Sequence, residues 1–434
     1  MRRARFALWI ALLLILTPAL RADLYSYVAS DDGAYKWEME GERDLGDGFK
    51  LYELKLTSQV WQGITWLHSL RVIVPPNLKS PTLALLFITG SGKGEEELVY
   101  GKEICRSIRA PMAILHDVPY QPLFGGLRED KLIAYTFSKF IETEDETWPL
   151  LLPMVKSAVK AMDAVQEFSE EKLGVEVNGF VVTGASKRGW TTWLTAAVDE
   201  RVKAIAPMVY DNLNLKEQMK HQLEAWGTFS EQINDYTERN LPQMVVRGEN
   251  EQLFERLARL VDPYRHLERI TVPKLIIIGT NDRYWPLDAL NIYWDDLKGE
   301  RFILYDPNSG HGLEDRDRVL ADIIALFLKA SGEIEFPKLS WEFEERDGKL
   351  VLRVRSEGVE PAKVQAWVAG SPTRDFREAF WESRPMREED GSYVFELEKP
   401  SDGYSALFGE AIYEFGGKAK LFLSTQVRIV GGGG

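Results

Sequence analysis

The stretch that most constrains the fold of this chain is residues 179–190, GFVVTGASKRGW, in which a serine stands between an apolar strand and a helix. Residues 179–183 form a short apolar run that is typical of a buried strand. Small residues at Gly184 and Gly189 allow the backbone to turn sharply and lift the hydroxyl of Ser186 above the sheet. The spacing G-x-S-x-x-G is one residue longer than the usual G-x-S-x-G. The stretch predicts a nucleophile elbow, and a structural glycine-rich turn is the alternative.

Two partners for this serine follow along the chain. Residues 272–279 are typical of a fully buried strand, and Asp282 comes just after it. Residues 301–305 form another short apolar strand, and the loop after it carries His311. The carboxyl ends of such strands meet at the edge of the sheet where ligands of open α/β sheets bind. The order Ser186, acid, histidine is that of the α/β-hydrolase fold, so the sequence predicts this fold and this catalytic triad.

Both partners also have a structural interpretation. Asp282 follows Asn281 after a strand, which is ordinary turn chemistry, and a histidine between two glycines is typical of a solvated loop. The rival acid is Asp288, which we expect in the following helix. The remaining histidines are less well placed, since they lie in early strands or in a charged helical stretch: His68, His116, His221 and His266.

A glycine-rich loop, residues 90–94, follows the predicted strand 83–89. It does not fit a phosphate-binding Walker A motif, because Lys93 is followed by glycine. The backbone N–H groups of this loop are better suited to bind developing negative charge. We therefore expect an oxyanion hole built from the backbone of three residues, Gly90, Ser91 and Lys187.

Residues 211–270 are helical and charged in pattern and interrupt the alternation of strands and helices, which predicts a helical cap over the active site. Its aromatic residues either line a substrate cleft or pack the core of the cap: Trp226, Phe229 and Tyr236. Two further candidate substrate contacts are Tyr120, in the loop after strand 112–116, and Arg188, beside the nucleophile. Arg188 favours an acidic substrate unless it lies on a helix surface.

Composition excludes several classes of function. A chain of 434 residues with 45% hydrophobic residues has room for one large domain and a smaller one. The net charge of −14 argues against nucleic acid or an anionic membrane surface as a partner. Cys105 is the only cysteine, so no intrachain disulfide forms, and we expect a buried, inert thiol. No histidine or carboxylate cluster has ligand spacing, so we expect no metal and no cofactor.

The first residues have the pattern of an export signal. Arginines precede the apolar run 6–16, and small residues follow at Thr17, Ala19 and Ala22. We expect a signal peptide over residues 1–22 and a mature protein in the periplasm or outside the cell. The apolar run is too short to span a bilayer comfortably, so we expect no stable membrane anchor.

The end of the chain has a different pattern. After a linker at 331–337, short stretches alternate with period two and are separated by turn signals, as in an immunoglobulin-like β-sandwich. The predicted strands are 339–343, 349–354, 363–368, 392–397 and 420–427. We expect an α/β-hydrolase domain over 23–332 that keeps its fold alone, with an uncovered apolar surface. The second domain, 333–430, is then a packing or recognition module with a candidate partner of its own.

The chain resembles the PhoPQ-activated pathogenicity-related protein family. The resemblance covers nearly the whole mature chain and rests on four sites: Ser58-Gln59-Val60-Trp61 with Trp66-Leu67-His68, residues 184–190, Gly279-Thr280-Asn281-Asp282 and Arg374-Asp375-Phe376-Arg377. It implies an exported α/β-hydrolase domain with an appended β-sandwich. It also implies that the triad positions match Ser186, Asp282 and His311.

Two hypotheses of function follow. The first is a serine hydrolase that cleaves an ester or amide bond through an acyl-enzyme, with a small-molecule, carbohydrate-ester or peptide substrate. The second is a non-catalytic binding or signalling protein that keeps the fold without the chemistry. Retention of all three triad residues favours the first.

Overall fold

The structure of the chain is a computed structural model that describes residues 23–78, 83–92 and 94–431. The predicted signal peptide, 1–22, lies outside these residues. Across the described ranges, no helix combines the length and the apolar character needed to cross a membrane.

Among the described residues, nine strands form the central sheet, in the order β1-β2-β3-β5-β4-β6-β7-β8-β9. Three antiparallel strands form one end: β1 (Lys36–Asp44), β2 (Lys50–Trp61) and β3 (Ile64–Val74). Parallel strands form the rest: β4 (Leu83–Ile88), β5 (Met112–Leu115), β6 (Gly179–Ala185), β7 (Val202–Met208), β8 (Lys274–Gly279) and β9 (Arg301–Asp306). Strand β3 pairs antiparallel with β5, and β4 lies between β5 and β6. From β2 onward this is the strand order of the α/β-hydrolase fold, so the predicted fold class is confirmed.

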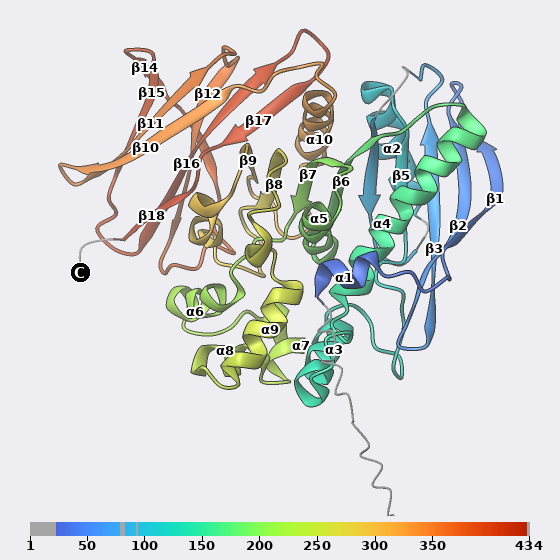
Figure 1. Cartoon of the computed structure of the whole chain (residues 1–434). Coiled ribbons are helices and arrows are strands. Elements are labelled where there is room, and N and C mark those ends of the chain that lie inside the picture. Colours follow the sequence, from blue (N-terminus) through green and yellow to red (C-terminus); the bar gives the residue numbers. More distant parts are fainter. Residues whose placement is uncertain (1–22, 79–82, 93, 432–434) are drawn as a thin grey trace, which may run out of the picture.

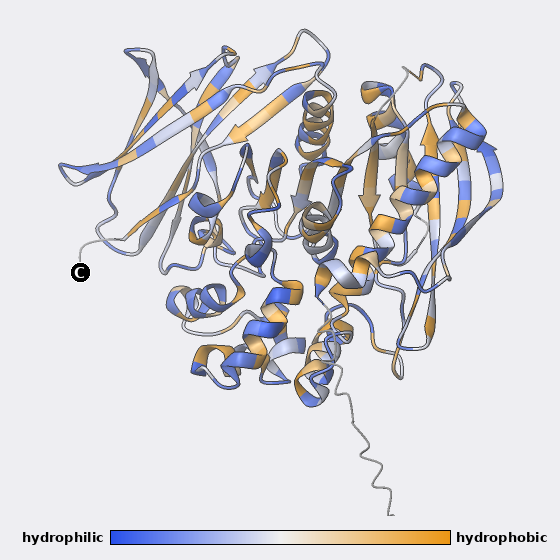
Figure 2. Cartoon of the chain, in the orientation of Figure 1, coloured by the Kyte–Doolittle hydropathy of each residue, from blue (hydrophilic) through white to orange (hydrophobic). Residues whose placement is uncertain are grey.

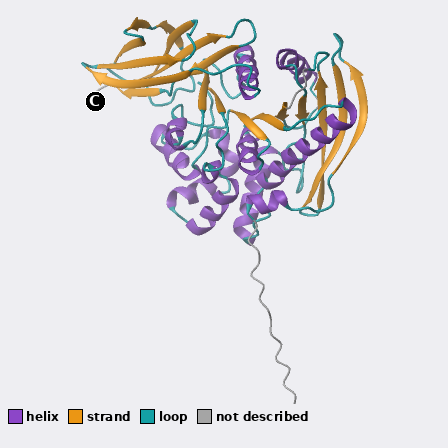
Figure 3. Cartoon of the chain, turned by 45° about the horizontal axis from the view of Figure 1, so that its top comes forward, coloured by secondary structure: helices purple, strands orange, loops and turns teal. Residues whose placement is uncertain are grey.

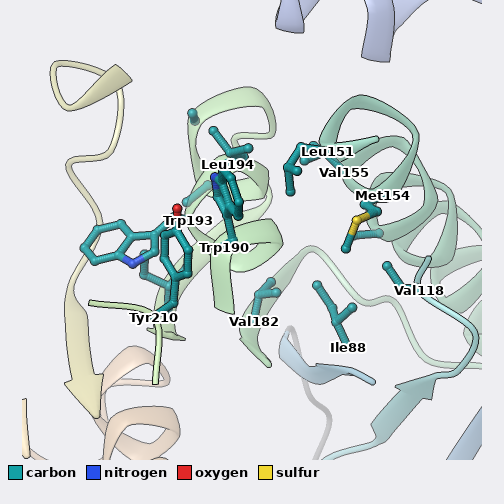
Figure 4. Close-up of a cluster of buried hydrophobic side chains, with 14 of the residues drawn as sticks. Ile88, Val118, Leu151, Met154, Val155, Val182, Trp190, Trp193, Leu194 and Tyr210 are labelled. Carbon is teal, nitrogen blue, oxygen red and sulfur yellow. The ribbon is translucent and has the colours of Figure 1, made fainter. Parts of the chain in front are cut away.

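Helices cover both faces of the sheet (Figure 1). One face carries α2 (Glu95–Ile108) and α10 (Arg316–Ala330), whose apolar residues join a hydrophobic core with β4, β7 and β8. The other face carries the remaining helices of the core: α1 (Leu24–Ala29), α3 (Glu129–Thr143), α4 (Leu151–Phe168) and α5 (Lys187–Val198). Because both faces are covered, the parallel strands are apolar along most of their length (Figure 2). Trp190 and Trp193 of α5 belong to the same buried cluster as Val182 and Ile88 (Figure 4).

The helical cap predicted at 211–270 is present between β7 and β8. Its helices are α6 (Leu215–Trp226), α7 (Asn234–Thr237), α8 (Leu241–Arg247) and α9 (Glu251–Val261). They gather with α3 at one end of the parallel strands (Figure 1), and Figure 3 shows helices grouped below the strands. Helices α6 and α8 end at Gly227 and Gly248, which adopt the left-handed conformation with φ of 71° and 70°.

The C-terminal region is a β-sandwich of two antiparallel sheets (Figure 1). One sheet contains β10 (Lys338–Arg346), β11 (Lys349–Glu357), β15 (Ser392–Glu398) and β14 (Arg387–Glu389). The other contains β13 (Glu382–Pro385), β12 (Lys363–Ser371), β16 (Tyr404–Glu414), β17 (Lys420–Ser424) and β18 (Arg428–Gly431). The strand expected at 420–427 ends at Ser424, as β17. The sequence pattern missed β13, β14, β16 and β18, of which β16 is the longest. Strand β16 contains Gly409, where an added Cβ would lie 3.0 Å from Val354 of the facing sheet.

The sandwich is joined to the hydrolase domain by buried polar contacts. The N–H of Tyr305 in β9 donates to the Ser424 hydroxyl of β17 at 3.0 Å. On α10, Asp322 accepts a hydrogen bond of 2.7 Å from the N–H of Phe422, and Arg318 pairs with the fully buried Glu410. The two domains therefore share one continuous interior.

Candidate active site

Ser186 occupies the sharp turn between β6 and α5. Its φ of 59° and ψ of −126° are strained for a residue with a side chain. The turn fits only because glycines flank it. A Cβ at Gly189 would lie 2.7 Å from the carbonyl oxygen of Met208, and one at Gly184 would lie 2.9 Å from that of Ile88. The strand–serine–helix geometry is that of a nucleophile elbow.

Asp282 and His311 meet at the ends of β8 and β9. The Nδ1 atom of His311 lies 2.8 Å from Oδ2 of Asp282, whose side chain is only 7% exposed. Tyr284 supports both residues, because its N–H donates to Asp282 at 2.9 Å and its ring lies 4.2 Å from the imidazole. Nε2 of His311 is buried and has no hydrogen-bond partner among the described residues, Ser186 included. This nitrogen is the one that a serine hydroxyl would use.

The rival acid, Asp288, has other partners. Its carboxylate lies 2.7 Å from Nε2 of His221 and 2.7 Å from the guanidinium of Arg374. Burial alone would raise the pKa of Asp288, but His221 and Arg374 lower it below its usual value. The structure thus separates Asp288 from His311 and gives it a contact with the C-terminal domain.

The predicted oxyanion-hole residues lie on two neighbouring loops. Gly90 and Ser91 follow β4, whose last residue, Ile88, is paired in register with Gly184 of β6. Lys187 is the first residue of α5, where backbone N–H groups have no partner within the helix. The Ser91 hydroxyl accepts a hydrogen bond of 3.0 Å from Gln121. This arrangement brings both predicted segments to the carboxyl edge of the sheet.

Two acidic residues that the sequence pattern did not single out, Glu129 and Asp130, neutralise the cations beside Ser186. Lys187 is 8% exposed, and its ammonium lies 3.0 Å from Glu129 and 3.2 Å from Asp130. Arg188 forms two hydrogen bonds of 2.8 Å with Glu129. Burial would raise the pKa of Glu129, but Arg188 and Lys187 lower it to about 2. Acidic residues in the first turn of a helix are common for dipole reasons, so their position gave no specific signal.

The contacts of Arg188 bear on its expected role in substrate binding. Its side chain is 11% exposed, and its Nε donates to the carbonyl oxygen of Val118 at 2.5 Å. A Cβ at Gly90 would lie 2.5 Å from its guanidinium. The Nε, Nη1 and Nη2 atoms of Arg188 all donate hydrogen bonds within the protein. Arg188 therefore supports the elbow and the loop at Gly90, and few of its N–H groups remain to bind an acidic substrate.

The predicted aromatic contacts are dispersed. The Trp226 ring packs under the guanidinium of Arg377 from the C-terminal domain, 4.2 Å away. Tyr120 packs against Trp66, with ring centroids 6.3 Å apart. Tyr236 donates to Asp130 at 3.0 Å. Trp226 and Tyr120 therefore both contact neighbouring side chains of the protein itself.

The cap also covers an apolar pocket of about 130 Å³. Its wall includes Tyr236 and Trp190, which lies one helical turn after Ser186. Ser186, Asp282 and His311 are not among the lining residues. Among the described residues, no group of three histidine, cysteine, aspartate or glutamate side chains is arranged to hold a metal ion.

Comparison with known proteins identifies the family. Over 93% of its length the chain is 32% identical to autocrine proliferation repressor protein A of Dictyostelium discoideum, and the match covers 89% of that protein. It is also similar to two solved acetyl xylan esterases. The enzyme from Paenibacillus sp. R4 is 15% identical with a TM-score of 0.49, over 68% of this chain and 91% of that one. The Thermoanaerobacterium enzyme is 16% identical with a TM-score of 0.49, over 71% and 93%. Residues 24–377 match the model of the PhoPQ-activated pathogenicity-related proteins, and the chain belongs to this family.

Proposed function

We propose that the chain is an exported serine hydrolase that cleaves an ester or amide bond through Ser186, Asp282 and His311. The observation that carries the proposal is the 2.8 Å contact between Asp282 and Nδ1 of His311, which leaves the other ring nitrogen free to act. The strained turn at Ser186 supports it, since such strain is typical of functional sites.

In the proposed reaction, Nε2 of His311 removes the proton from Ser186 as its oxygen attacks the carbonyl carbon. Asp282 holds the imidazole in the required tautomer and stabilises the imidazolium that forms. The backbone N–H of Lys187, with those at Gly90 and Ser91, binds the developing oxyanion. His311 then donates the proton to the leaving group. A water molecule, activated by His311, hydrolyses the resulting acyl-enzyme.

The charges around the nucleophile bear on the substrate class. Lys187 and Arg188 are both paired with carboxylates of Glu129 and Asp130. Their positive charge is therefore balanced locally, and an acidic substrate has no unpaired cation to bind at these two positions. We propose an uncharged acyl group, on a small-molecule, carbohydrate or peptide substrate.

Covalent labelling tests this proposal. We expect a fluorophosphonate probe to label the wild-type protein at Ser186, because its phosphorus atom is attacked readily by an activated serine hydroxyl. Ser186→Ala should lose both the label and the hydrolysis of p-nitrophenyl acetate, with an unchanged circular dichroism spectrum. Equal labelling of wild type and Ser186→Ala would refute the assignment, and an unlabelled, folded wild type would favour a non-catalytic binding protein.

Export is a separate part of the proposal. It rests on the basic, apolar and small-residue segments of residues 1–22. We expect the intact mass of the protein recovered from the periplasm or medium to correspond to cleavage after residue 19 or 22. Recovery of the uncleaved chain from the cytoplasm would contradict it.

A further inference from the structure

Two asparagines connect the loops of Asp282 and His311 to the C-terminal domain. The side-chain amide of Asn281 donates to the backbone carbonyl oxygens of Phe376, Arg377 and Ala379, at 3.3, 3.3 and 2.7 Å. Asn281 directly precedes Asp282 in the chain. Its amide therefore fixes the loop of the proposed catalytic acid against a segment nearly one hundred positions away in sequence.

Asn308 makes the equivalent connection for the histidine loop. Its side chain donates to the carbonyl oxygen of Trp381 at 3.0 Å and accepts from the Trp381 N–H at 2.7 Å. This pair of hydrogen bonds engages both backbone groups of Trp381, so it fixes orientation as well as distance. Asn308 lies in the turn between β9 and His311.

The two loops are also bonded to each other. Thr280 donates its hydroxyl to Asn281 at 2.8 Å and accepts the N–H of Asn308 at 2.9 Å. The N–H of Asn281 donates to the carbonyl oxygen of Ser309 at 2.9 Å. A Cβ at Gly279 would lie 2.2 Å from the carbonyl oxygen of Gly310, so the backbones are in close contact. A displacement of either loop therefore moves the other.

The segment that receives these bonds, 372–381 between β12 and β13, is itself fixed. Phe376 and Trp381 are 2% and 1% exposed. Arg377 forms hydrogen bonds of 2.9 and 2.6 Å with Asp375 and reaches Glu231 of the cap at 2.7 Å. The segment thus contacts the acid loop, the histidine loop and the cap from one rigid position.

We propose that Asn281 and Asn308 are positioning residues, through which the C-terminal domain holds Asp282 and His311 in register with Ser186. The inference rests on the proposed function and assigns the C-terminal domain a part in it. The physical reason is that catalytic side chains work only when they are held within about 0.5 Å of their productive positions. The segment contributes only backbone groups to these hydrogen bonds. The backbone conformation of residues 376–381 therefore determines where the two asparagines are held.

Asn281→Ala tests the proposal against a matched control, Asn291→Ala. Asn291 also bonds the C-terminal domain, donating to the carbonyl oxygen of Val427 at 3.0 Å and accepting from Gln426 at 2.9 Å. It lies in the short helical turn Ala289–Ile292, outside the loops of Asp282 and His311. Each variant of the full-length protein loses interdomain amide bonds, but Asn281→Ala also releases the acid loop.

The readouts are kcat and KM on p-nitrophenyl acetate, the rate of fluorophosphonate labelling, and Tm. We expect both variants to lower Tm. Asn281→Ala should also lower kcat and the labelling rate by about 10- to 100-fold with a smaller change in KM, the loss typical of a misplaced catalytic group. Asn291→Ala should keep kcat within about twofold of wild type, since it touches neither loop. A kcat for Asn281→Ala equal to that of Asn291→Ala would overturn the proposal.

Asn308→Ala replaces Asn281→Ala if the latter does not fold, and the same loss of kcat is expected. A folded Asn308→Ala with wild-type kcat would overturn the inference. Ser186→Ala in the same assay separates the two proposals. If Ser186→Ala retains turnover, the proposed function fails. If Ser186→Ala is inactive while Asn281→Ala and Asn308→Ala keep wild-type kcat, only the positioning role fails.

Discussion

Asp282 and Asp288 follow the same strand but face different partners. Asp282 contacts His311, whereas Asp288 contacts His221 and Arg374. Asp282→Asn should therefore lower kcat on p-nitrophenyl acetate by a large factor, on the order of 10⁴ as in serine proteases, because the amide favours the wrong imidazole tautomer. Asp288→Asn should leave kcat near the wild-type value and lower Tm. Ser186→Ala sets the background rate, and the opposite pattern would transfer the role of the acid to Asp288.

Glu129 links the elbow to the start of α3 and predicts a pH dependence of stability. Arg188 and Lys187 hold its pKa at about 2, below the ordinary 4.5, against the effect of burial. A depressed pKa in the folded state gives stabilisation that is complete above pH 4.5 and lost as pH falls toward 2. Glu129→Gln should lower Tm at neutral pH, and the difference from wild type should shrink over this interval.

Thermal unfolding at several pH values measures this difference. Glu342→Gln, at an exposed position on β10, is the control, and its Tm should follow wild type at every pH. A constant difference between Glu129→Gln and wild type from pH 7 to about pH 2 would mean that the carboxylate charge of Glu129 does not stabilise the fold.

Sequence position identified the proposed triad because each residue follows an apolar strand, and strand ends are visible locally. It did not identify Glu129, Asp130 or Asn281. Their partners lie far away in the chain: Arg188 for Glu129, and carbonyl oxygens of 376–379 for Asn281. An acidic residue that starts a helix and an asparagine that follows a strand have ordinary local explanations, so only the fold shows their roles.

At the level of elements, the parallel strands were predictable because burial on both faces gives continuous apolar runs. Strand β16 was not, since its central residues include Ala406, Gly409 and Ala411, which have low strand propensity. Small residues are favoured there by tertiary packing: β16 lies between two other layers, with Gly409 close to Leu352 and Phe408 close to Tyr305. Packing between sheets therefore overrode local preference.

The crossing of α5 over the end of β7 requires a glycine at 189. An added methyl group would lie 2.7 Å from the carbonyl oxygen of Met208 and 3.1 Å from Cβ of Tyr210. Gly189→Ala should reduce the free energy of unfolding by about 1–3 kcal/mol, as overpacking does, and lower kcat because α5 carries the elbow. Urea denaturation measures the change. Gly370→Ala is the control, since its methyl group would meet Tyr404 only at 3.9 Å.

Comparing the stabilities of Gly189→Ala and Gly370→Ala tests whether close packing at the elbow is required. Gly370→Ala should change the free energy of unfolding by no more than roughly 0.5 kcal/mol, as surface substitutions do. If Gly189→Ala matched it in stability and kept wild-type kcat, α5 would have room to shift. The tight contact between α5 and β7 would then not be needed to hold Ser186.

At the scale of the whole molecule, the interface between the two domains contains fully buried, paired polar groups, as the interior of a single domain does. Glu410 is fully buried and pairs with Arg318 of α10. Its other oxygen accepts hydrogen bonds of 2.7 Å from Gln365 and 3.1 Å from Trp367. Removing one partner from such a buried pair typically costs about 3–5 kcal/mol. This pattern differs from the polar, hydrated contacts of domains that move independently.

The interface bears on the expectation that residues 23–332 keep the hydrolase fold alone, with an uncovered apolar surface. Helix α10 lies within that fragment, yet its Arg318 and Asp322 have their partners in the C-terminal domain. Burial raises the pKa of Asp322 well above its usual value, so the interface disfavours the ionised form of this carboxyl. In the fragment, the C-terminal domain no longer buries this carboxyl or the apolar surface around it.

We therefore predict that the fragment 23–332 has a lower Tm than the full chain, binds the dye ANS, and hydrolyses p-nitrophenyl acetate poorly. Exposed apolar surface explains the first two results. The third follows because Asn281 and Asn308 lose the backbone of 376–381, which holds their loops. Circular dichroism melts, ANS fluorescence and kcat measure the three. Adding the separate fragment 333–434 in excess should restore part of the activity if the domain acts as a template. A fragment with the Tm and kcat of the full chain would show that the hydrolase domain holds its own active site.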